Sequence, residues 1–352
     1  MSGNILIYGA TGYTGKLAAR MAHARGLKPI LAGRNSDKLE AVAGPLGLAW
    51  RAFDLADPAR LDAGLEDVAV VLCIAGPFSA TSRPVADACI RRHVHYLDIT
   101  GEIDVFEALA ARDAEAKQAG VMLLPGVGFD VVPSDCLAAE LKRRLPDAVD
   151  LKIYIGASSA NISRGTAKTA VQAIAAGTRV RRGGRLVKCD RARRGTCDFG
   201  HGPRPTARIA WGDVSTAFYS TGIPDIEVQA EVVPALEVIV RLPGFVKSAL
   251  GLAPMQSFLK SLIDRQSEGP SDEARQSGRS TLVGVARNAK GETARLRLRL
   301  PDPYTLTAMT ALDIARRVTA GEFKLGFQTP SLVYGADYIL GFGGVTREEP
   351  NA

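Results

Sequence analysis

Short apolar runs alternate with amphipathic segments along the first 145 residues of the chain. The runs 5–8, 29–32, 49–53, 68–74, 96–99 and 121–124 have the length and content of buried strands. Between them, apolar residues recur at helical spacing over 15–25, 36–46, 57–64, 82–92, 104–119 and 133–145. This alternation is typical of a parallel sheet with helices on both faces. It predicts an α/β fold with a doubly wound, Rossmann-type N-terminal domain.

After Pro146 the pattern changes to runs with period-two alternation or many β-branched residues. Such runs occupy 149–157, 206–211, 226–233, 236–242 and 280–300, with one helical segment over 164–177. The stretch "RNAKGET" inside the last run is typical of a hairpin turn. We expect a second, α+β domain with a mostly antiparallel or mixed sheet. The polar stretch 267–280 predicts a loop.

One segment between these runs, 245–263, is apolar at helical spacing. Core packing against the second sheet is one interpretation. A flap over an apolar substrate channel, or a surface that touches lipid, is the other. The apolar residues are Phe245, Val246, Ala249, Leu252, Met255, Phe258, Leu259, Leu262 and Ile263.

Composition limits the classes of protein to consider. The 352 residues carry a net charge of +7, and eight of the sixteen residues 179–194 are Lys or Arg. No aromatic residues interrupt this basic run for base stacking, so we expect a solvated hairpin or loop and no nucleic-acid partner. Five cysteines without a Cys-x-x-Cys pair indicate reduced thiols and a cytoplasmic protein. No signal peptide or transmembrane helix is expected.

The first candidate for chemistry is "GATGYTGKL", which lies between the first apolar run and the first helical segment. A triphosphate loop needs a glycine, then four residues, then Gly-Lys-Ser/Thr. Here Ala10 stands in place of the first glycine and Leu17 in place of the Ser/Thr. The spacing of Gly9, Gly12 and Gly15 instead fits the turn that holds a dinucleotide pyrophosphate at a helix N-terminus. The predicted cofactor residues in this turn are Gly9, Thr11, Gly12, Tyr13, Thr14 and Gly15.

The end of the second strand distinguishes NAD from NADP. An NAD site places an acid there for the ribose 2′-hydroxyl, whereas a 2′-phosphate requires a cation. This chain has no acid there, so the sequence favours NADP, with Arg34, Asn35, Ser36 and Lys38 around the phosphate. Asp54 is a candidate acceptor for the adenine amino group or a helix cap. After the fourth strand, the small residues Ala75, Gly76 and Pro77 would let the backbone pass close to the ribose and nicotinamide of the cofactor. Phe78 is a candidate to line the nicotinamide ring.

A reductase also needs a proton donor beside the nicotinamide. None of the eight tyrosines has a lysine four residues later, which argues against short-chain dehydrogenase chemistry. Acids and hydroxyls gather after the fifth and sixth strands, at the edge where doubly wound sheets bind ligands. They are Tyr96, Asp98, Thr100, Glu102, Asp130, Ser134 and Asp135. Asp98 and Thr100 are also candidate helix caps, and Ser134 and Asp135 are candidates to open the helix that follows. We predict Tyr96, Glu102 and Asp130 as catalytic residues, and no metal site.

The segments "GATGYTG", "AGR", "AGPF", "HYLDITGE" and "GVGFDVVPSD" resemble the saccharopine dehydrogenase-like oxidoreductases, and in particular the branch of trans-acting enoyl reductases. The resemblance implies an NADP-binding domain over 1–145, an α+β substrate or dimerisation domain over 146–320, and a C-terminal segment, 321–352, that returns to the first domain. Members that act on saccharopine-like amino acids carry an Asp-Pro-Gly type turn after the sixth strand. Here residues 126–130 read Gly-Val-Gly-Phe-Asp, which weakens the case for an amino-acid substrate.

These observations predict an NADP-dependent reductase of a C=N, C=O or C=C bond in a small, hydrophobic or lipid-derived molecule. A protein that binds NADP for regulation or lipid association, without hydride transfer, is the alternative. A homodimer is the default expectation for such a chain.

Overall fold

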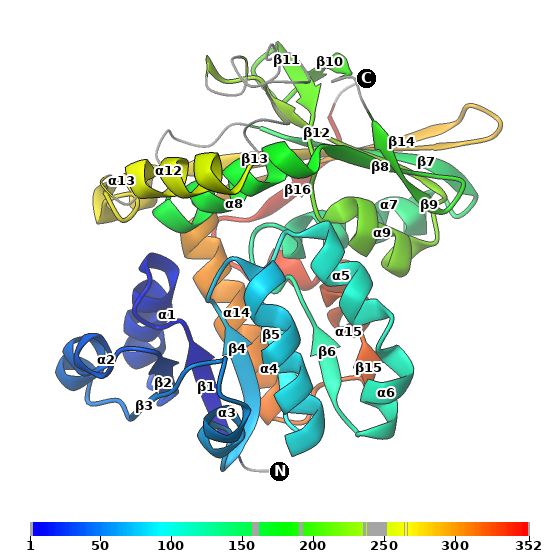
Figure 1. Ribbon diagram of the computed structural model, residues 1–352. Coiled ribbons are helices and arrows are strands. Elements are labelled where there is room, and N and C mark those ends of the chain that lie inside the picture. Colours follow the sequence, from blue (N-terminus) through cyan, green and yellow to red (C-terminus); the bar gives the residue numbers. More distant parts are fainter. Residues whose placement is uncertain are drawn as a thin grey trace. The chain divides into compact units, whose positions relative to one another are not determined.

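The structure, a computed structural model, describes residues 3–156, 162–189, 193–234, 237, 252–263, 265 and 267–350 (Figure 1). Contacts within the chain divide it into two compact units. The first comprises Met1–Val132 and Tyr304–Val333, and the second comprises Pro133–Pro303 and Tyr334–Ala352. The first unit is therefore assembled from two stretches that are far apart in the sequence.

The first unit contains a seven-stranded parallel sheet in the order β15-β6-β5-β4-β1-β2-β3. Its strands are β1 (Asn4–Tyr8), β2 (Ile30–Gly33), β3 (Trp50–Ala52), β4 (Val68–Cys73), β5 (His95–Asp98), β6 (Met122–Leu124) and β15 (Gly326–Phe327). The first six strands have the order 3-2-1-4-5-6 of the Rossmann fold. The predicted fold class is confirmed for this unit.

The helices of the first unit follow the strands closely. They are α1 (Tyr13–Ala24), α2 (Ser36–Ala43), the 3-10 turn η1 (Gly44–Leu46), α3 (Pro58–Gly64), α4 (Phe78–Arg92), α5 (Ile103–Ala110), α6 (Asp113–Gln118), α14 (Pro303–Thr319) and α15 (Pro330–Tyr334). The central strands are buried on both faces, as in β1, where Leu6 and Ile7 have no exposed surface. Strands covered on both sides read as continuous apolar runs, which explains why the sequence located them well.

Three expectations for this unit need correction. The helix expected over 104–119 is two helices, α5 and α6, separated by Ala111 and Arg112. Helix α4 begins at Phe78, four residues before the expected start at 82, because residues of another loop cap its first turn. The sheet also gains a seventh strand, β15, which pairs with β6 and has only two residues, too few to produce a pattern.

The second unit contains a nine-stranded sheet, of which the main path is β10-β11-β12-β7-β13-β14-β16. Its strands are β7 (Ala148–Ile155), β8 (Thr178–Arg182), β9 (Arg185–Cys189), β10 (Arg194–Asp198), β11 (Pro203–Arg208), β12 (Asp225–Glu231), β13 (Arg279–Asn288), β14 (Thr293–Pro301) and β16 (Thr346–Glu348). Only the β12–β7 pair is parallel among the described pairs of this sheet. The sheet is mixed and mostly antiparallel, as predicted.

The helices of the second unit are α7 (Val132–Arg144), α8 (Arg164–Ala176), α9 (Asp213–Thr221), α12 (Ala253–Ile263) and α13 (Asp272–Ser277), with the 3-10 turn η2 (Tyr338–Gly341). Helix α7 packs closely on β13, because a Cβ at Gly284 would lie 2.5 Å from the Leu141 side chain. Helix α13 lies inside the stretch expected as a loop. Ser271 caps it by accepting a hydrogen bond from the Ala274 main-chain N–H.

Residues 179–189 of the basic run lie in the hairpin β8–β9, which confirms the expected hairpin. Arg181 pairs with Leu186 and Arg182 with Arg185 across the two-residue turn. Both turn residues, Gly183 and Gly184, have positive φ angles, as the tightest hairpin turns require.

The segment 245–263 is only partly described: residues 245–251 lie outside the described part of the chain. Leu252 precedes α12, which comprises the remaining residues, and the interpretation as core packing agrees with the burial of Ile263. It is wrong for Leu252, Met255, Phe258 and Leu262, which are 62%, 40%, 57% and 41% exposed. In the described segments, no helix is both long enough and apolar enough to cross a membrane.

Candidate functional site

The order of the strands reverses between β1 and β4, and ligands of doubly wound sheets bind at the carboxyl ends of strands at this point. The glycine-rich turn follows β1, and the loop 74–77 follows β4. The two come into direct contact: a Cβ at Gly9 would lie 2.8 Å from the main-chain nitrogen of Ala75. Gly9 also has φ +92°, which side chains rarely permit. Only glycine fits both demands at this position.

Gly15 and Gly12 have different surroundings. A Cβ at Gly15 would lie 2.3 Å from the main-chain oxygen of Gly9, so this glycine allows α1 to pack directly on the turn. At Gly12 a Cβ would meet only the Gly9 oxygen, at an ordinary 3.5 Å. Gly12 is exposed, and the space above it is open. Packing within the protein therefore does not require a glycine at position 12, whereas the close approach of a ligand would.

Helix α1 begins at Tyr13 with Gly12 as its N-cap, and Gly12 has no side chain that could cap the first turn. The first N–H groups of a helix need acceptors, and together with the helix dipole they attract anions. Tyr13 and Thr14 are half-buried and Thr11 lies beside them. A helix start whose N-cap is an open glycine fits a pyrophosphate, which Gly12, Tyr13 and Thr14 would hold through main-chain N–H groups.

At the end of β2, Arg34, Asn35, Ser36 and Lys38 are all exposed. The Asn35 side chain caps α2 by accepting a hydrogen bond of 2.9 Å from the Lys38 N–H. In the described part of the chain, the Arg34 guanidinium forms no ion pair with a carboxylate. Arg34 thus has its charge available at the place where a 2′-phosphate would lie.

Asp54 follows β3 and accepts a hydrogen bond of 2.9 Å from the Ala56 N–H. This contact fixes the turn after the strand and leaves Asp54 exposed. Nearby, Tyr8 donates a hydrogen bond to the Phe53 oxygen, and burial raises the pKa of Tyr8 to about 12. Tyr8 is therefore a neutral packing residue beneath the site.

The loop after β4 is held from two sides. The Thr81 hydroxyl donates a 2.6 Å hydrogen bond to the Ala75 oxygen, and the Gly76–Pro77 peptide is cis. On the other side, the Glu102 carboxylate accepts hydrogen bonds from the N–H groups of Phe78, at 2.7 Å, and Ser79, at 2.8 Å. Both Glu102 oxygens are thus used to cap α4, a role that the sequence did not indicate for this candidate acid.

The carboxylate of Asp98 joins the loops after β5 and β6. Asp98 has no exposed surface; its Oδ1 accepts 2.9 Å hydrogen bonds from the N–H groups of Thr100 and Gly126. Its Oδ2 accepts a 2.6 Å bond from the Tyr96 hydroxyl. Burial raises the pKa of Asp98 to about 6, although these hydrogen bonds oppose the change.

Tyr96, predicted as catalytic, also has no exposed surface. Burial, with the nearby Asp98 carboxylate as a second cause, raises the pKa of its phenol well above the usual value. Its hydroxyl is directed to Asp98. The structure therefore places Tyr96 beneath the site, as a support for the Asp98 carboxylate.

Asp130 is the third predicted catalytic residue. It is half-buried, and its Oδ2 lies directly above Gly101, where a Cβ would come within 2.9 Å. Removal from water raises the pKa of Asp130 to about 6. Gly101 follows β5 and Asp130 follows β6, so the carboxylate stands at the ligand-binding edge of the sheet.

The two remaining acids and hydroxyls of the sequence prediction lie in α7. Ser134 and Asp135 are buried in the first turn of that helix, in the second unit. Metal ligands are not gathered anywhere in the described ranges: no group of three or more His, Cys, Asp or Glu side chains is placed to hold an ion.

Helix α14 supplies contacts that sequence reasoning missed. The Thr307 hydroxyl accepts a 3.0 Å hydrogen bond from the Phe129 N–H, and the Thr310 hydroxyl donates a 2.8 Å bond to the Val127 oxygen. At the start of the helix, the ring of Tyr304 meets Tyr13 edge-on, with ring centres 5.2 Å apart. Helix α14 therefore supports both the loop that carries Asp130 and the start of α1.

Comparison with known proteins agrees with this geometry. Residues 5–124 match the family described as "Saccharopine dehydrogenase NADP binding domain". The trans-acting enoyl reductase of Mycobacterium tuberculosis is 34% identical over 149 residues, which are 40% of this chain and 36% of that protein. The Mycobacterium leprae protein of the same name is 35% identical over 150 residues, also 40% of this chain and 36% of the relative. The similarity thus spans about a third of each relative's length.

A similar fold extends over the whole chain. The apo saccharopine dehydrogenase (L-Glu forming) of Saccharomyces cerevisiae superposes with a TM-score of 0.67, at 12% sequence identity, over 99% of this chain and 100% of that one. At this identity the likeness concerns the fold, with its parallel Rossmann-like sheet and its second, mixed sheet. The sequence match is confined to residues 5–124, where it agrees with the glycine turn and the strand order and indicates similarity to the saccharopine dehydrogenase NADP binding domain.

Proposed function

We propose that this protein is an NADP-dependent reductase of a C=C bond conjugated to a carbonyl group. The observation that carries the proposal is the start of α1 at the β1/β4 switch point, with an open Gly12 as its N-cap, together with Arg34 at the end of β2, which forms no ion pair with a carboxylate of the described residues. The absence of an acid after β2 favours NADP over NAD. The enoyl substrate class rests on the name shared by the mycobacterial relatives.

When bound, NADPH supplies a hydride to one carbon of the double bond, and the neighbouring carbon needs a proton. Of the three predicted catalytic residues, Asp130 suits this task best. Tyr96 is buried beneath the site, and both oxygens of Glu102 cap α4. Asp130 stands at the sheet edge with a raised pKa, so a fraction of it holds a proton near neutral pH.

Glu102, Asp98 and Thr310 act as positioning residues in this proposal. Glu102 fixes the loop after β4, Asp98 ties together the loops after β5 and β6, and Thr310 holds the loop that carries Asp130. Such a connected support keeps the cofactor loop and the proton donor in a fixed relation.

The test has two stages, binding and turnover. NADPH and NADH binding are first measured by nicotinamide fluorescence. NADPH oxidation is then followed with enoyl, ketone and imine substrates. Asp130→Asn is compared with Asp67→Asn, which removes an exposed acid from the opposite, amino-terminal end of β4.

We expect enoyl turnover in the parent protein and in Asp67→Asn, and NADPH binding without turnover in Asp130→Asn. The parent rate should fall as the pH rises through about 6, because the acid loses its proton there. Tight NADPH binding with no turnover on any substrate class would instead support an NADP-binding regulatory protein. Turnover confined to imines would replace the enoyl assignment.

A further inference from the structure

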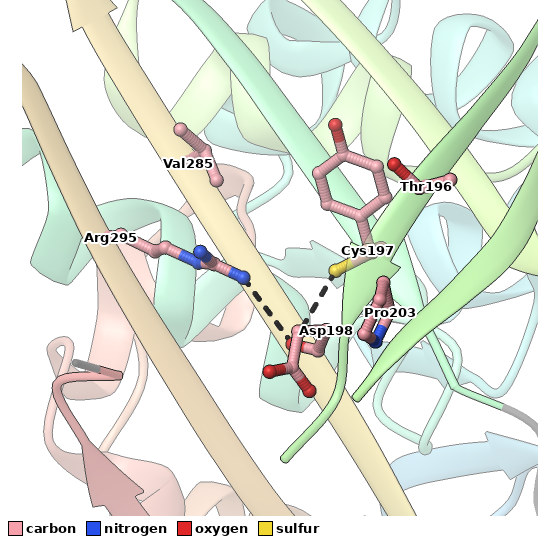
Figure 2. A pocket seen from close by; sticks show the side chains of 7 residues that line it. Thr196, Cys197, Asp198, Pro203, Val285 and Arg295 are labelled. Atoms are coloured by element: carbon pink, nitrogen blue, oxygen red, sulfur yellow. Dashed lines mark hydrogen bonds between the residues drawn. The ribbon is translucent and has the colours of Figure 1, made fainter. Parts of the chain in front are cut away.

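A separate pocket of about 290 Å³ lies in the second unit (Figure 2). Its lining comes from strands β7, β10, β13 and β14 and from the first residue of β11. None of these elements carries a residue of the nucleotide site. The pocket therefore needs an explanation of its own.

The pocket lining contains one cationic side chain, Arg295 on β14, and one acidic side chain, Asp198 on β10. Figure 2 shows the Arg295 guanidinium extending across the pocket toward Cys197 and Asp198. Its NH2 group donates a 3.3 Å hydrogen bond to the main-chain oxygen of Asp198, and its Nε is buried without a partner. Among the described residues, no carboxylate forms an ion pair with Arg295.

The nearby acids are used elsewhere. The Asp198 carboxylate points away from the guanidinium in Figure 2 and accepts hydrogen bonds from the N–H groups of Gly200 and Gly202, at 2.7 and 3.0 Å. These bonds, that from Gly200 first, keep the pKa of Asp198 below its usual range. Glu348 is shared by the next two arginines of the strand, Arg297 and Arg299.

Residues two apart on a strand lie on the same face, so Arg295, Arg297 and Arg299 form one row. Glu348 offsets one positive charge of this row, and the Asp198 carboxylate is turned away from it. The row therefore has an excess of positive charge, concentrated at Arg295. A partly buried arginine without an acidic partner favours an anion.

The remaining lining decides what kind of anion fits. Val285 and Pro203 contribute apolar surface, and Tyr154 and Thr196 contribute hydroxyl groups. Beneath the pocket, Val283 and Phe199 form a buried apolar cluster with Cys197. The volume lies at the lower end of the range for small-molecule sites, so the pocket suits a small organic ligand.

We propose that this pocket binds a short-chain carboxylate, with the carboxylate group on Arg295 and the alkyl chain against Val285 and Pro203. The planar guanidinium matches the two oxygens of a carboxylate, and the apolar wall distinguishes such a ligand from an inorganic anion. The inference does not depend on the proposed reductase activity.

The probe is sodium butyrate, titrated into the full-length protein at constant ionic strength while the methyl groups of Val285 are followed by NMR. Inorganic phosphate is titrated in parallel. Arg295→Gln removes the guanidinium, and Arg287→Gln is the matched control, since it removes an exposed charge of β13 outside the pocket lining. Arg295→Lys keeps the charge and loses the planar group.

We expect a saturable Val285 shift with butyrate in the parent and in Arg287→Gln. Affinity should fall at least about tenfold in Arg295→Gln, the loss typical of a hydrogen bond to a charged group, and by less in Arg295→Lys. If Arg295→Gln does not fold, the comparison of Arg295→Lys with the parent decides. The proposal would be overturned if butyrate caused no Val285 shift or one that does not saturate. It would also be overturned if the Arg295 variants bound butyrate as tightly as the parent, or if the parent bound phosphate as tightly as butyrate.

Discussion

Glu102 lies 2.7 Å from the main-chain nitrogen of Phe78, so a side chain that follows β5 closes the first turn of the helix that follows β4. The same carboxylate also accepts the Ser79 N–H, at 2.8 Å. Two neighbouring strand-end loops are thereby joined at the edge of the sheet that carries the proposed nucleotide site.

This contact predicts how Glu102→Ala behaves. The variant leaves two helix N–H groups without their acceptor, and loss of such a cap costs about 1 kcal/mol of unfolding free energy. Urea unfolding measures this loss. Glu107→Ala, on the helix that Glu102 precedes, is the control for removing an acid. Unchanged stability together with abolished turnover would return Glu102 to the role of proton donor.

The glycines of the first turn make a sharper prediction. Gly12→Ala should leave the unfolding free energy nearly unchanged, because its Cβ meets only the Gly9 oxygen at 3.5 Å, and should abolish NADPH binding by filling the open approach. Gly15→Ala should destabilise the fold itself, because its Cβ would lie 2.3 Å from the same oxygen. Thermal unfolding and nicotinamide fluorescence separate the two effects. Normal NADPH binding by Gly12→Ala would contradict the assigned pyrophosphate position.

Arg34 provides the test of cofactor choice. Arg34→Ala should weaken NADPH binding by about 1–3 kcal/mol, the range for a lost hydrogen bond to a charged group, and should change NADH binding much less. Arg25→Ala, at the opposite end of α1, controls for the loss of one exposed positive charge. Titration of both nucleotides gives the four affinities. Equal losses for NADPH and NADH would exclude contact with the 2′-phosphate.

Asp98 predicts a dependence of stability on pH. Its pKa is about 6 in the folded chain and about 3.8 when exposed, so the folded state binds more protons between these values. Protonated Asp98 therefore contributes about 3 kcal/mol to the free energy of unfolding. This contribution is complete below about pH 4 and is lost as the pH rises through about 6.

Asp98→Asn should remove this loss. The amide oxygen can accept both N–H groups that Oδ1 accepts, and the amide nitrogen can donate to the Tyr96 oxygen. Urea unfolding from pH 4 to 7 should therefore show the parent losing stability relative to the variant. Parallel curves for the two proteins would show that Asp98 is ionised throughout this range.

The geometry of the glycine-rich turn could be predicted from the sequence because it is local. Gly9 and Gly15 are needed by a single turn, and the lack of an acid beside Arg34 is visible in the strand itself. The roles of Glu102 and Thr310 depend on partners that are 24 and 183 residues away. A glutamate before a helix and a threonine inside one have many ordinary explanations, so neither pattern indicates its partner.

The contacts of α14 also determine when the nucleotide-binding unit is complete during synthesis. The ribosome releases Met1–Val132 long before Tyr304–Val333 has been made. Until then, β6 has an open edge where β15 will pair, and the Val127 oxygen and Phe129 N–H lack their threonine partners. Open strand edges on a nascent chain invite pairing with other chains. A message truncated before codon 304 would therefore yield a nucleotide-binding unit that aggregates, even though every glycine of its turn is present.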